Sequence, residues 1–209
     1  MAVTKNILFD LGNVLIDIDF NKVKRAFEKL GIENFEQQFS QLSASRLFED
    51  LEMGKISNEQ FYKTIQQQST LPLNDEQIKN AWNAILLDFR KESMNFLMQH
   101  NNNYRFFLLS NTNAIHLEEV NIILQKQCNK NDLDEFFEKA YYSHKVGLRK
   151  PNEDIFQYVL RDANIKGEET LFIDDTPPNI DTAIKLGFKT HLLLPGQKIE
   201  ELSYWSHIK

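Results

Sequence analysis

The stretch Ile7-Leu8-Phe9-Asp10-Leu11-Gly12-Asn13-Val14 decides the predicted fold. It opens with a short continuous apolar run, and such a run before a polar turn is typical of a strand that is buried in a parallel sheet. The pattern recurs at Phe106–Leu109, Leu171–Ile173 and His191–Leu194, and more weakly at Lys139–Tyr142. We therefore expect a parallel sheet whose first strand ends just before Asp10.

Helical patterns lie between the later strands, so strand and helix alternate along much of the chain. The expected helices cover Thr112–Gln125, Pro151–Ala163 and Pro177–Leu186. Thr176 is the expected N-cap of the last helix, and Pro177 suits its first position, where the N–H has no helical partner. The alternation predicts an α/β fold with a Rossmann-like parallel-sheet core and helices on both faces.

The segment from Phe20 to about Asp88 interrupts this alternation, because it shows only helical periodicity and helix-capping patterns. Its apolar residues recur at three- and four-residue spacing, as expected for a small bundle. These positions are Val23, Phe27, Leu30, Phe61, Ile65, Ile78, Trp82 and Ile85. We therefore expect an all-helical insert over residues 17–88, between two parts of the core at 1–16 and 89–209.

The composition argues against several functional classes. The 209 residues are 42% apolar and carry a formal net charge of −6, which gives no general attraction to nucleic acid or to an anionic membrane. No apolar run approaches the ~20 residues of a membrane-spanning helix. The single cysteine, Cys128, has no intrachain partner, and no signal-peptide pattern precedes the first strand. We therefore expect a cytoplasmic protein whose partners are neither nucleic acid nor membrane.

Polar residues follow the predicted strands where ligands bind in an open parallel sheet. They are Asp10 and Gly12 after the first strand, Ser110 and Asn111 after the second, Lys150 before a helix that starts with proline, and Asp174 and Asp175 after a later strand. Each group alone has an ordinary explanation, the Asp residues and Ser110 as turn or helix-capping residues and Lys150 as a solvated surface charge. Four such segments together favour a functional site at one edge of the sheet.

Three carboxylates held close together cannot all stay ionised without a compensating cation. Mg²⁺ is the simplest such cation, because it prefers oxygen ligands and is typically held by one or two carboxylates and substrate phosphate oxygens. We expect Asp10 and Asp174 to be ligands and Lys150 to face a phosphate. Ser110 and nearby backbone N–H groups are the expected donors to the other phosphate oxygens. The set suits a small phosphorylated metabolite.

The ordered motifs resemble those of the haloacid dehalogenase-like (HAD) hydrolase superfamily. The matching segments are Ile7 to Val14, Leu109-Ser110-Asn111, Gly147-Leu148-Arg149-Lys150-Pro151 and Phe172-Ile173-Asp174-Asp175. The helical insert is similar to that family's small cap. Within the family, the pattern most resembles bacterial sugar-phosphate phosphatases, including those acting on α-D-glucose 1-phosphate.

The resemblance implies a two-step phosphoryl transfer. The Asp10 carboxylate attacks phosphorus, forms an aspartyl-phosphate and is regenerated by water, and Lys150 supports the reaction as a second catalytic residue. The resemblance further assigns Mg²⁺ to Asp10, Gly12 (through its carbonyl), Asp174 and Asp175, and the transferring group to Ser110, Asn111 and Lys150. Their role is to stabilise charge on the phosphoryl oxygens.

One position departs from the family pattern. Many of its phosphatases carry a second Asp two residues after the nucleophile as general acid, and this chain has Gly12 there. Such assistance is typically worth ~10²–10⁴ in rate. Asp17, Asp19, another residue of the helical insert or a water are the alternatives for this role, and an anomeric sugar phosphate needs it least. Gly12 itself also suits a close backbone approach or a positive φ.

Two other functions remain open from the sequence. One is a 2-haloacid hydrolase, which needs no leaving-group acid but leaves the Asp174-Asp175 pair without a cation. The other is a protein that binds a phosphorylated ligand without turning it over. Substrate selection is expected from the helical insert, with Arg46, Phe48 and Glu49 as candidates and hinges near residues 16–20 and Phe89. Oligomeric state is not predicted.

Overall fold

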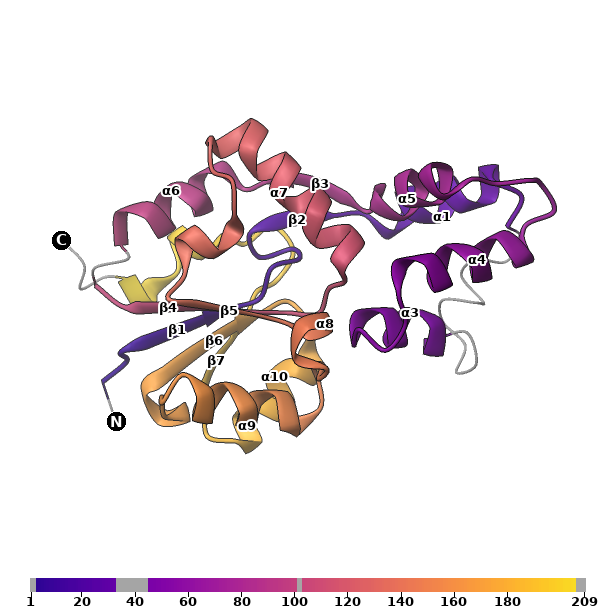
Figure 1. The fold of residues 1–209 in the computed structure, drawn as a ribbon. Helices are drawn as coiled ribbons and strands as arrows, with labels where there is room; N and C mark the ends of the chain where they lie inside the picture. The colour runs from indigo at the N-terminus through magenta and orange to yellow at the C-terminus, as the bar shows by residue number, and fades with distance from the viewer. Residues whose placement is uncertain (1–2, 33–44, 101–102, 206–209) are drawn as a thin grey trace.

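The computed structural model describes residues 3–32, 45–100 and 103–205. At its centre lies a five-stranded parallel sheet in the order β5-β4-β1-β6-β7 (Figure 1). The strands are β1 (Asn6–Phe9), β4 (Arg105–Ser110), β5 (Lys139–Tyr142), β6 (Thr170–Asp174) and β7 (Lys189–Leu192). The predicted parallel sheet is therefore confirmed, with β1 in the middle.

The last strand differs from its prediction, which was His191–Leu194. β7 begins at Lys189, where it pairs with Leu171 of β6, and it ends at Leu192. The apolar run continues past the strand, since Leu193 is buried and Leu194 is exposed. The apolar run therefore marked the second half of this strand and missed its polar start.

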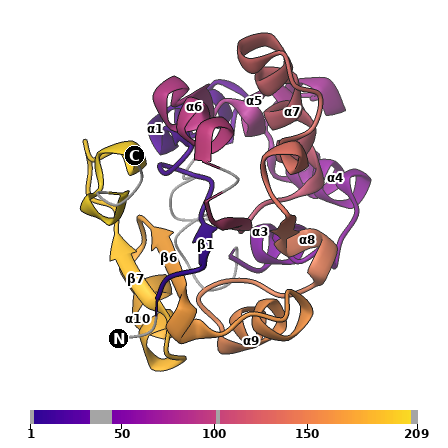
Figure 2. The same cartoon turned by 90° about the vertical axis from the view of Figure 1, so that its left-hand side faces the viewer.

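Helices cover both faces of the sheet, as the two views show (Figures 1 and 2). One face carries α6 (Lys91–His100) and α7 (Ala114–Cys128), and the other carries α9 (Glu153–Asp162) and α10 (Pro177–Lys185). Short elements complete this part of the chain: η1 (Leu133–Phe136), α8 (Ser143–Val146), η2 (Gly167–Glu169), η3 (Ile199–Glu201) and η4 (Ser203–Trp205). The predicted Rossmann-like core with helices on both faces is confirmed.

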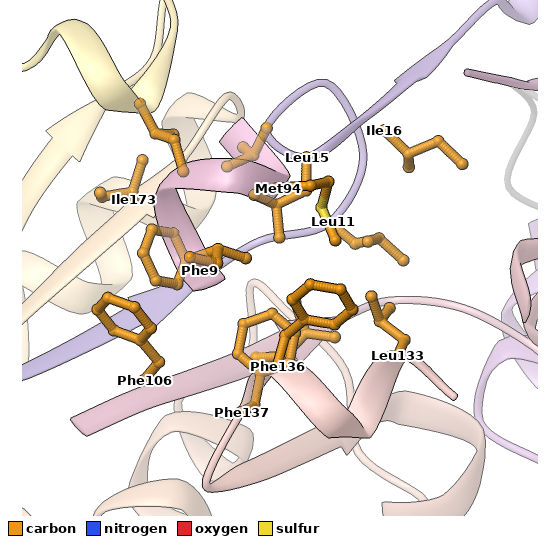
Figure 3. Close-up of a cluster of buried hydrophobic side chains, with 14 of the residues drawn as sticks. Phe9, Leu11, Leu15, Ile16, Met94, Phe106, Leu133, Phe136, Phe137 and Ile173 are labelled. Atoms are coloured by element: carbon orange, nitrogen blue, oxygen red, sulfur yellow. The ribbon is translucent and has the colours of Figure 1, made fainter. Parts of the chain in front are cut away.

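The alternation of side chains along β1 explains the two layers, because successive residues of a strand point to opposite faces. Ile7 and Phe9 belong to the apolar core under α6 and α7, whereas Leu8 belongs to the core under α9 and α10. Phe9 lies edge-on to Phe106, with ring centroids 5.4 Å apart, in the cluster shown in Figure 3. Packing on both faces holds the end of β1, where Asp10 follows, in a fixed position.

The helical insert contains α1 (Phe20–Lys29), α3 (Ser45–Glu52), α4 (Asn58–Gln68) and α5 (Asp75–Asn83). Capping boxes start α4 and α5, at Ser57 with Gln60 and at Asn74 with Gln77, in agreement with the helix-capping patterns of this segment. The insert has an apolar core of its own, which contains all the predicted apolar positions, with Leu30 only partly buried. Ile115 of α7 also belongs to this core, so the insert packs on the Rossmann-like part.

A strand pair joins the insert to the sheet at the places where hinges were expected, and the sequence predicted no strand there. β2 (Ile16–Ile18) runs antiparallel to β3 (Leu86–Phe89), and the Arg90 backbone N–H donates to the Leu15 carbonyl at 2.8 Å. Each strand is too short to show a strand period of its own and is defined only by its partner. Across the part of the chain that the structure describes, no helix is both long and apolar enough to span a bilayer.

Candidate active site

The carboxyl ends of three neighbouring strands bring the predicted site residues together. Asp10 follows β1, and its backbone N–H donates to the Ile173 carbonyl of β6 at 2.9 Å. Ser110 is the last residue of β4, and Asp174 is the last residue of β6. Because β4 and β6 flank β1, these three side chains start from adjacent positions on one edge.

Lys150 lies between the two buried carboxylates. Its Nζ donates to Asp10 Oδ1 at 2.5 Å and to Asp174 Oδ2 at 2.7 Å. The Lys150 side chain is only 2% exposed, and its ammonium also lies 5.5 Å from the centre of the Phe172 ring. A lysine buried to this degree requires anionic partners, and Asp10 and Asp174 provide them.

Asp174 is held by several donors. Its carboxylate accepts from the Thr176 backbone N–H at 2.8 Å and from Asn179 Nδ2, which lies 3.0 Å from each oxygen. Asp175, next along the chain, accepts from Asn13 Nδ2 at 2.9 Å. The pair is therefore oriented both by the start of α10 and by the turn after β1.

The charges of this cluster shift the pKa values of its members. Burial raises the pKa of Asp10 to about 7, and the nearby Asp174 and Asp175 act in the same direction, whereas Lys150 opposes them. Burial acts to lower the pKa of Lys150, but its contacts with Asp10 and Asp174 outweigh burial and hold that pKa above its usual value. Lys150 therefore favours the ionised form of Asp10, and Asp10 and Asp174 favour the charged form of Lys150.

The donor set fits a hard divalent cation. Asp10, Asp174 and Asp175 each offer an oxygen, and these oxygens lie within 4.8 Å of one another. With all three carboxylates in the ionised form, the one ammonium of Lys150 would leave two formal negative charges in a largely buried cluster for a cation to offset. All three donors are carboxylates, which is the chemistry that Mg²⁺ prefers.

Asn111 contacts the protein in a way that the sequence did not predict. Its Nδ2 donates to the Lys150 carbonyl and its Oδ1 accepts from the Lys150 N–H, each at 2.9 Å. These two hydrogen bonds hold the loop that carries Lys150 against the end of β4. Ser110 is buried and lines a cavity of about 130 Å³ beside the cluster.

Gly12 also lines this cavity. A Cβ at Gly12 would lie 3.2 Å from Ile18 Cδ1, so Ile18 occupies the space next to the position where a side chain would begin. Of the two conformational reasons predicted for this glycine, close approach applies, whereas the positive φ of this turn (53°) belongs to Asn13. Asn13 is thereby turned toward Asp175, which sequence reasoning missed.

The candidates for substrate selection have different surroundings from those expected. Phe48 is buried and stacks on Trp82 at 5.0 Å, and Arg46 is exposed. Glu49 pairs with Arg149, Oε1 to Nη1, at 2.9 Å. The residue of α3 that lines the cavity is instead Glu52. A helical period identifies a buried face, but it does not show which residue at the end of a helix meets a neighbouring loop.

The chain belongs to the haloacid dehalogenase-like hydrolases, whose family model matches residues 4–187. It is 31% identical over 192 residues to a D-ribitol-5-phosphate phosphatase of Bacteroides thetaiotaomicron, covering 89% of this chain and 90% of that protein. The predicted membership is thus confirmed, and one named relative is a bacterial sugar-phosphate phosphatase.

Solved structures agree with the assignment. A HAD family enzyme of Bacteroides thetaiotaomicron, in complex with magnesium and inorganic phosphate, matches with a TM-score of 0.86 at 35% identity, over 93% of this chain and 96% of that one. A HAD-like hydrolase of Porphyromonas gingivalis matches with a TM-score of 0.85 at 37% identity, over 94% of each chain. An L-2-haloacid dehalogenase shares the fold, with a TM-score of 0.59 at 17% identity over 97% of this chain and 92% of that one.

Proposed function

We propose that this protein is a Mg²⁺-dependent phosphatase that hydrolyses a small sugar or polyol phosphate through an aspartyl-phosphate on Asp10. The observation that carries the proposal is the buried cluster in which Asp10 and Asp174 share Lys150 beside a small cavity. The relative that acts on D-ribitol 5-phosphate and the neighbour solved with magnesium and phosphate support the same reaction.

In the proposed reaction, the Asp10 carboxylate attacks phosphorus in line with the leaving oxygen, and water then cleaves the acyl phosphate and regenerates Asp10. Lys150 acts to lower the pKa of Asp10 against the effect of burial, and it adds positive charge beside the transferring group. Ser110, at the end of β4, is the proposed side-chain donor to a phosphoryl oxygen. Asn111 holds the backbone of Lys150 and thereby sets the position of the ammonium.

The residues proposed to hold Mg²⁺ are Asp10, Asp174, Asp175 and the carbonyl of Gly12. When bound, the ion supplies positive charge that lets Asp10 approach an anionic phosphate without repulsion. Asn13 and Asn179 orient the carboxylates of Asp175 and Asp174 from outside the cluster.

We also propose the division of the chain into a hydrolase core, 1–16 and 89–209, and a helical cap, 17–88. The separate apolar core of the insert supports it. The β2–β3 pair lies at the proposed boundary and is where closure of the cap over the substrate would bend the chain. A cytoplasmic location is proposed from the single cysteine, Cys128.

The test is phosphate release from a panel of phosphate esters, including D-ribitol 5-phosphate, glucose 1-phosphate and glycerol phosphate, with and without Mg²⁺. Wild type is compared with Asp10→Asn, and Asp154→Asn, which alters an exposed carboxylate at the start of α9, is the matched control. We expect Mg²⁺-dependent release that Asp10→Asn abolishes and Asp154→Asn preserves. Binding of the esters without release, or release of halide from a 2-haloacid, would contradict the proposal.

A further inference from the structure

The cavity beside the carboxylate cluster lacks a side chain at the position where related phosphatases carry an acid. Gly12 lines its wall, and Ile18 fills the adjoining space. The alternatives Asp17 and Asp19 lie elsewhere in the structure. Asp17 pairs with Arg90 at 2.8 Å, Asp19 caps α1, and neither lines the cavity.

Two titratable side chains line the same cavity, and they come from different helices, α7 and α3. His116, from α7, has both ring nitrogens occupied by Asn113 and the Trp82 carbonyl, and burial lowers its pKa to about 4. The ring is therefore neutral near pH 7 and is not in the imidazolium form that a general acid needs. Glu52, the last residue of α3, is the one carboxyl group among the described residues that line the cavity.

Glu52 is anchored at one oxygen. Its Oε2 is buried and lies 3.0 Å from Arg149 Nη2 in an ion pair that lacks hydrogen-bond geometry, while the side chain as a whole is 23% exposed. No described residue bonds its other oxygen, Oε1. Arg149 directly precedes Lys150, so the anchor connects Glu52 to the loop that carries the catalytic ammonium. The carboxyl group is thus held over the cavity by the residue next to Lys150.

Burial raises the pKa of Glu52, and Arg149 offsets only part of this effect. The neutral acid is therefore more accessible than in an exposed glutamate. The position also suits the reaction. In-line attack from Asp10 sends the leaving oxygen away from the sheet edge, and the helical insert that carries Glu52 lies beyond that edge (Figure 1).

We propose that Glu52 is the general acid and base of this phosphatase, in place of the side chain missing at Gly12. The inference rests on the proposed function. In the first step, Asp10 bonds to phosphorus, the ester P–O bond breaks, and the departing oxygen takes the Glu52 proton. In the second, water bonds to phosphorus, its proton passes to the Glu52 carboxylate, and the acyl phosphate bond breaks. Asp10 and protonated Glu52 are both regenerated.

The test distinguishes two roles of Glu52: proton transfer to the leaving group, and structural support of Arg149 through the ion pair. Glu52→Gln removes the transferable proton and keeps the size of the side chain. Glu49→Gln is the matched control, because Glu49 binds the other arm of Arg149 and does not line the cavity. First-turnover and steady-state rates are measured with Mg²⁺ for the best alkyl phosphate of the panel. They are also measured for 4-nitrophenyl phosphate, whose leaving phenolate departs without a proton.

We expect Glu52→Gln to lower the first-turnover rate with the alkyl phosphate by roughly 10²–10⁴-fold. With 4-nitrophenyl phosphate, it should keep the first-turnover burst of nitrophenolate and slow the later turnovers, because the water attack loses its base. Glu52→Asp should recover part of the alkyl phosphate turnover. Glu49→Gln, which alters only the contact with Arg149, should change the rates with the two substrates by the same factor.

Equal losses on both substrates, including the burst, would overturn the proposal and leave Glu52 as a brace for Arg149. Equal losses in Glu52→Gln and Glu49→Gln would have the same meaning. A thermal melt and Mg²⁺ titration of each variant separate misfolding from lost chemistry, and Glu52→Asp supplies a second folded test. If wild type with Mg²⁺ releases phosphate from neither substrate, the phosphatase function itself fails, and the role of Glu52 falls with it.

Discussion

Acid is expected to weaken the junction between α7 and the helical insert through His116. The His116 ring stacks on Trp82 with centroids 4.6 Å apart, and its Nε2 lies 3.2 Å from the Trp82 carbonyl. Asn113 Oδ1 accepts from the His116 backbone N–H. The other end of this amide, Asn113 Nδ2, therefore faces Nδ1 of the His116 ring, at 3.1 Å. Nδ1 must therefore accept and Nε2 must donate, which only the neutral ring can do.

The magnitude follows from the pKa difference. Burial lowers the pKa of His116 from 6.5 to about 4, so the unfolded chain binds more protons than the folded chain between these values. This contribution to stability is intact above pH 6.5 and is lost as the pH falls toward 4. It amounts to a loss of about 2.5 kcal/mol near pH 4.5. Asp10 acts in the opposite sense, because its raised pKa stabilises the folded chain in acid and that stability is lost as the pH rises toward about 7.

Only a difference between variants isolates the histidine. Urea unfolding of wild type and His116→Gln, followed by tryptophan fluorescence at about pH 7.5 and about pH 4.5, gives the cost of the substitution at each pH. We expect this cost to be about 2.5 kcal/mol smaller at the lower pH, because the variant has no imidazole to protonate. The Asp10 contribution is common to both chains and cancels. An equal cost at the two pH values would refute the assignment of a buried neutral ring.

Three further outcomes are expected. Lys150→Met should reduce Mg²⁺-dependent phosphate release by roughly 10²–10³-fold, because Asp10 loses its ammonium partner, and a wild-type rate would contradict this. Gly54→Ala should lower the free energy of unfolding, measured in urea, by about 2–4 kcal/mol. Gly54 has a φ of +65°, and a Cβ there would collide with the His144 carbonyl oxygen. A decrease under about 0.5 kcal/mol would disprove the tight contact. Mg²⁺ at about 100 times its Kd should add about 2.7 kcal/mol to the free energy of unfolding, measured with and without chelator, and Asp174→Asn should remove most of that gain.

The sheet and the carboxylate cluster could be predicted because both depend on local signals. Apolar runs mark strands that are buried on both faces, and the residues just after parallel strands must share an edge. Asp10 and Asp174 therefore met as expected. The β2–β3 pair could not be predicted in this way, because each strand is defined by a partner about seventy residues away.

The sequence by itself determined the fold class, the family and the identity of the charged residues at the sheet edge. Tertiary structure alone decided their partners. The side-chain amide of Asn111 makes both of its hydrogen bonds with the backbone of Lys150. Glu52 lines the cavity because Arg149 pairs with it there. Such contacts join segments about forty to a hundred residues apart, and periodicity and local propensity describe only neighbours along the chain. The distance between two side chains in space is set when the layers pack.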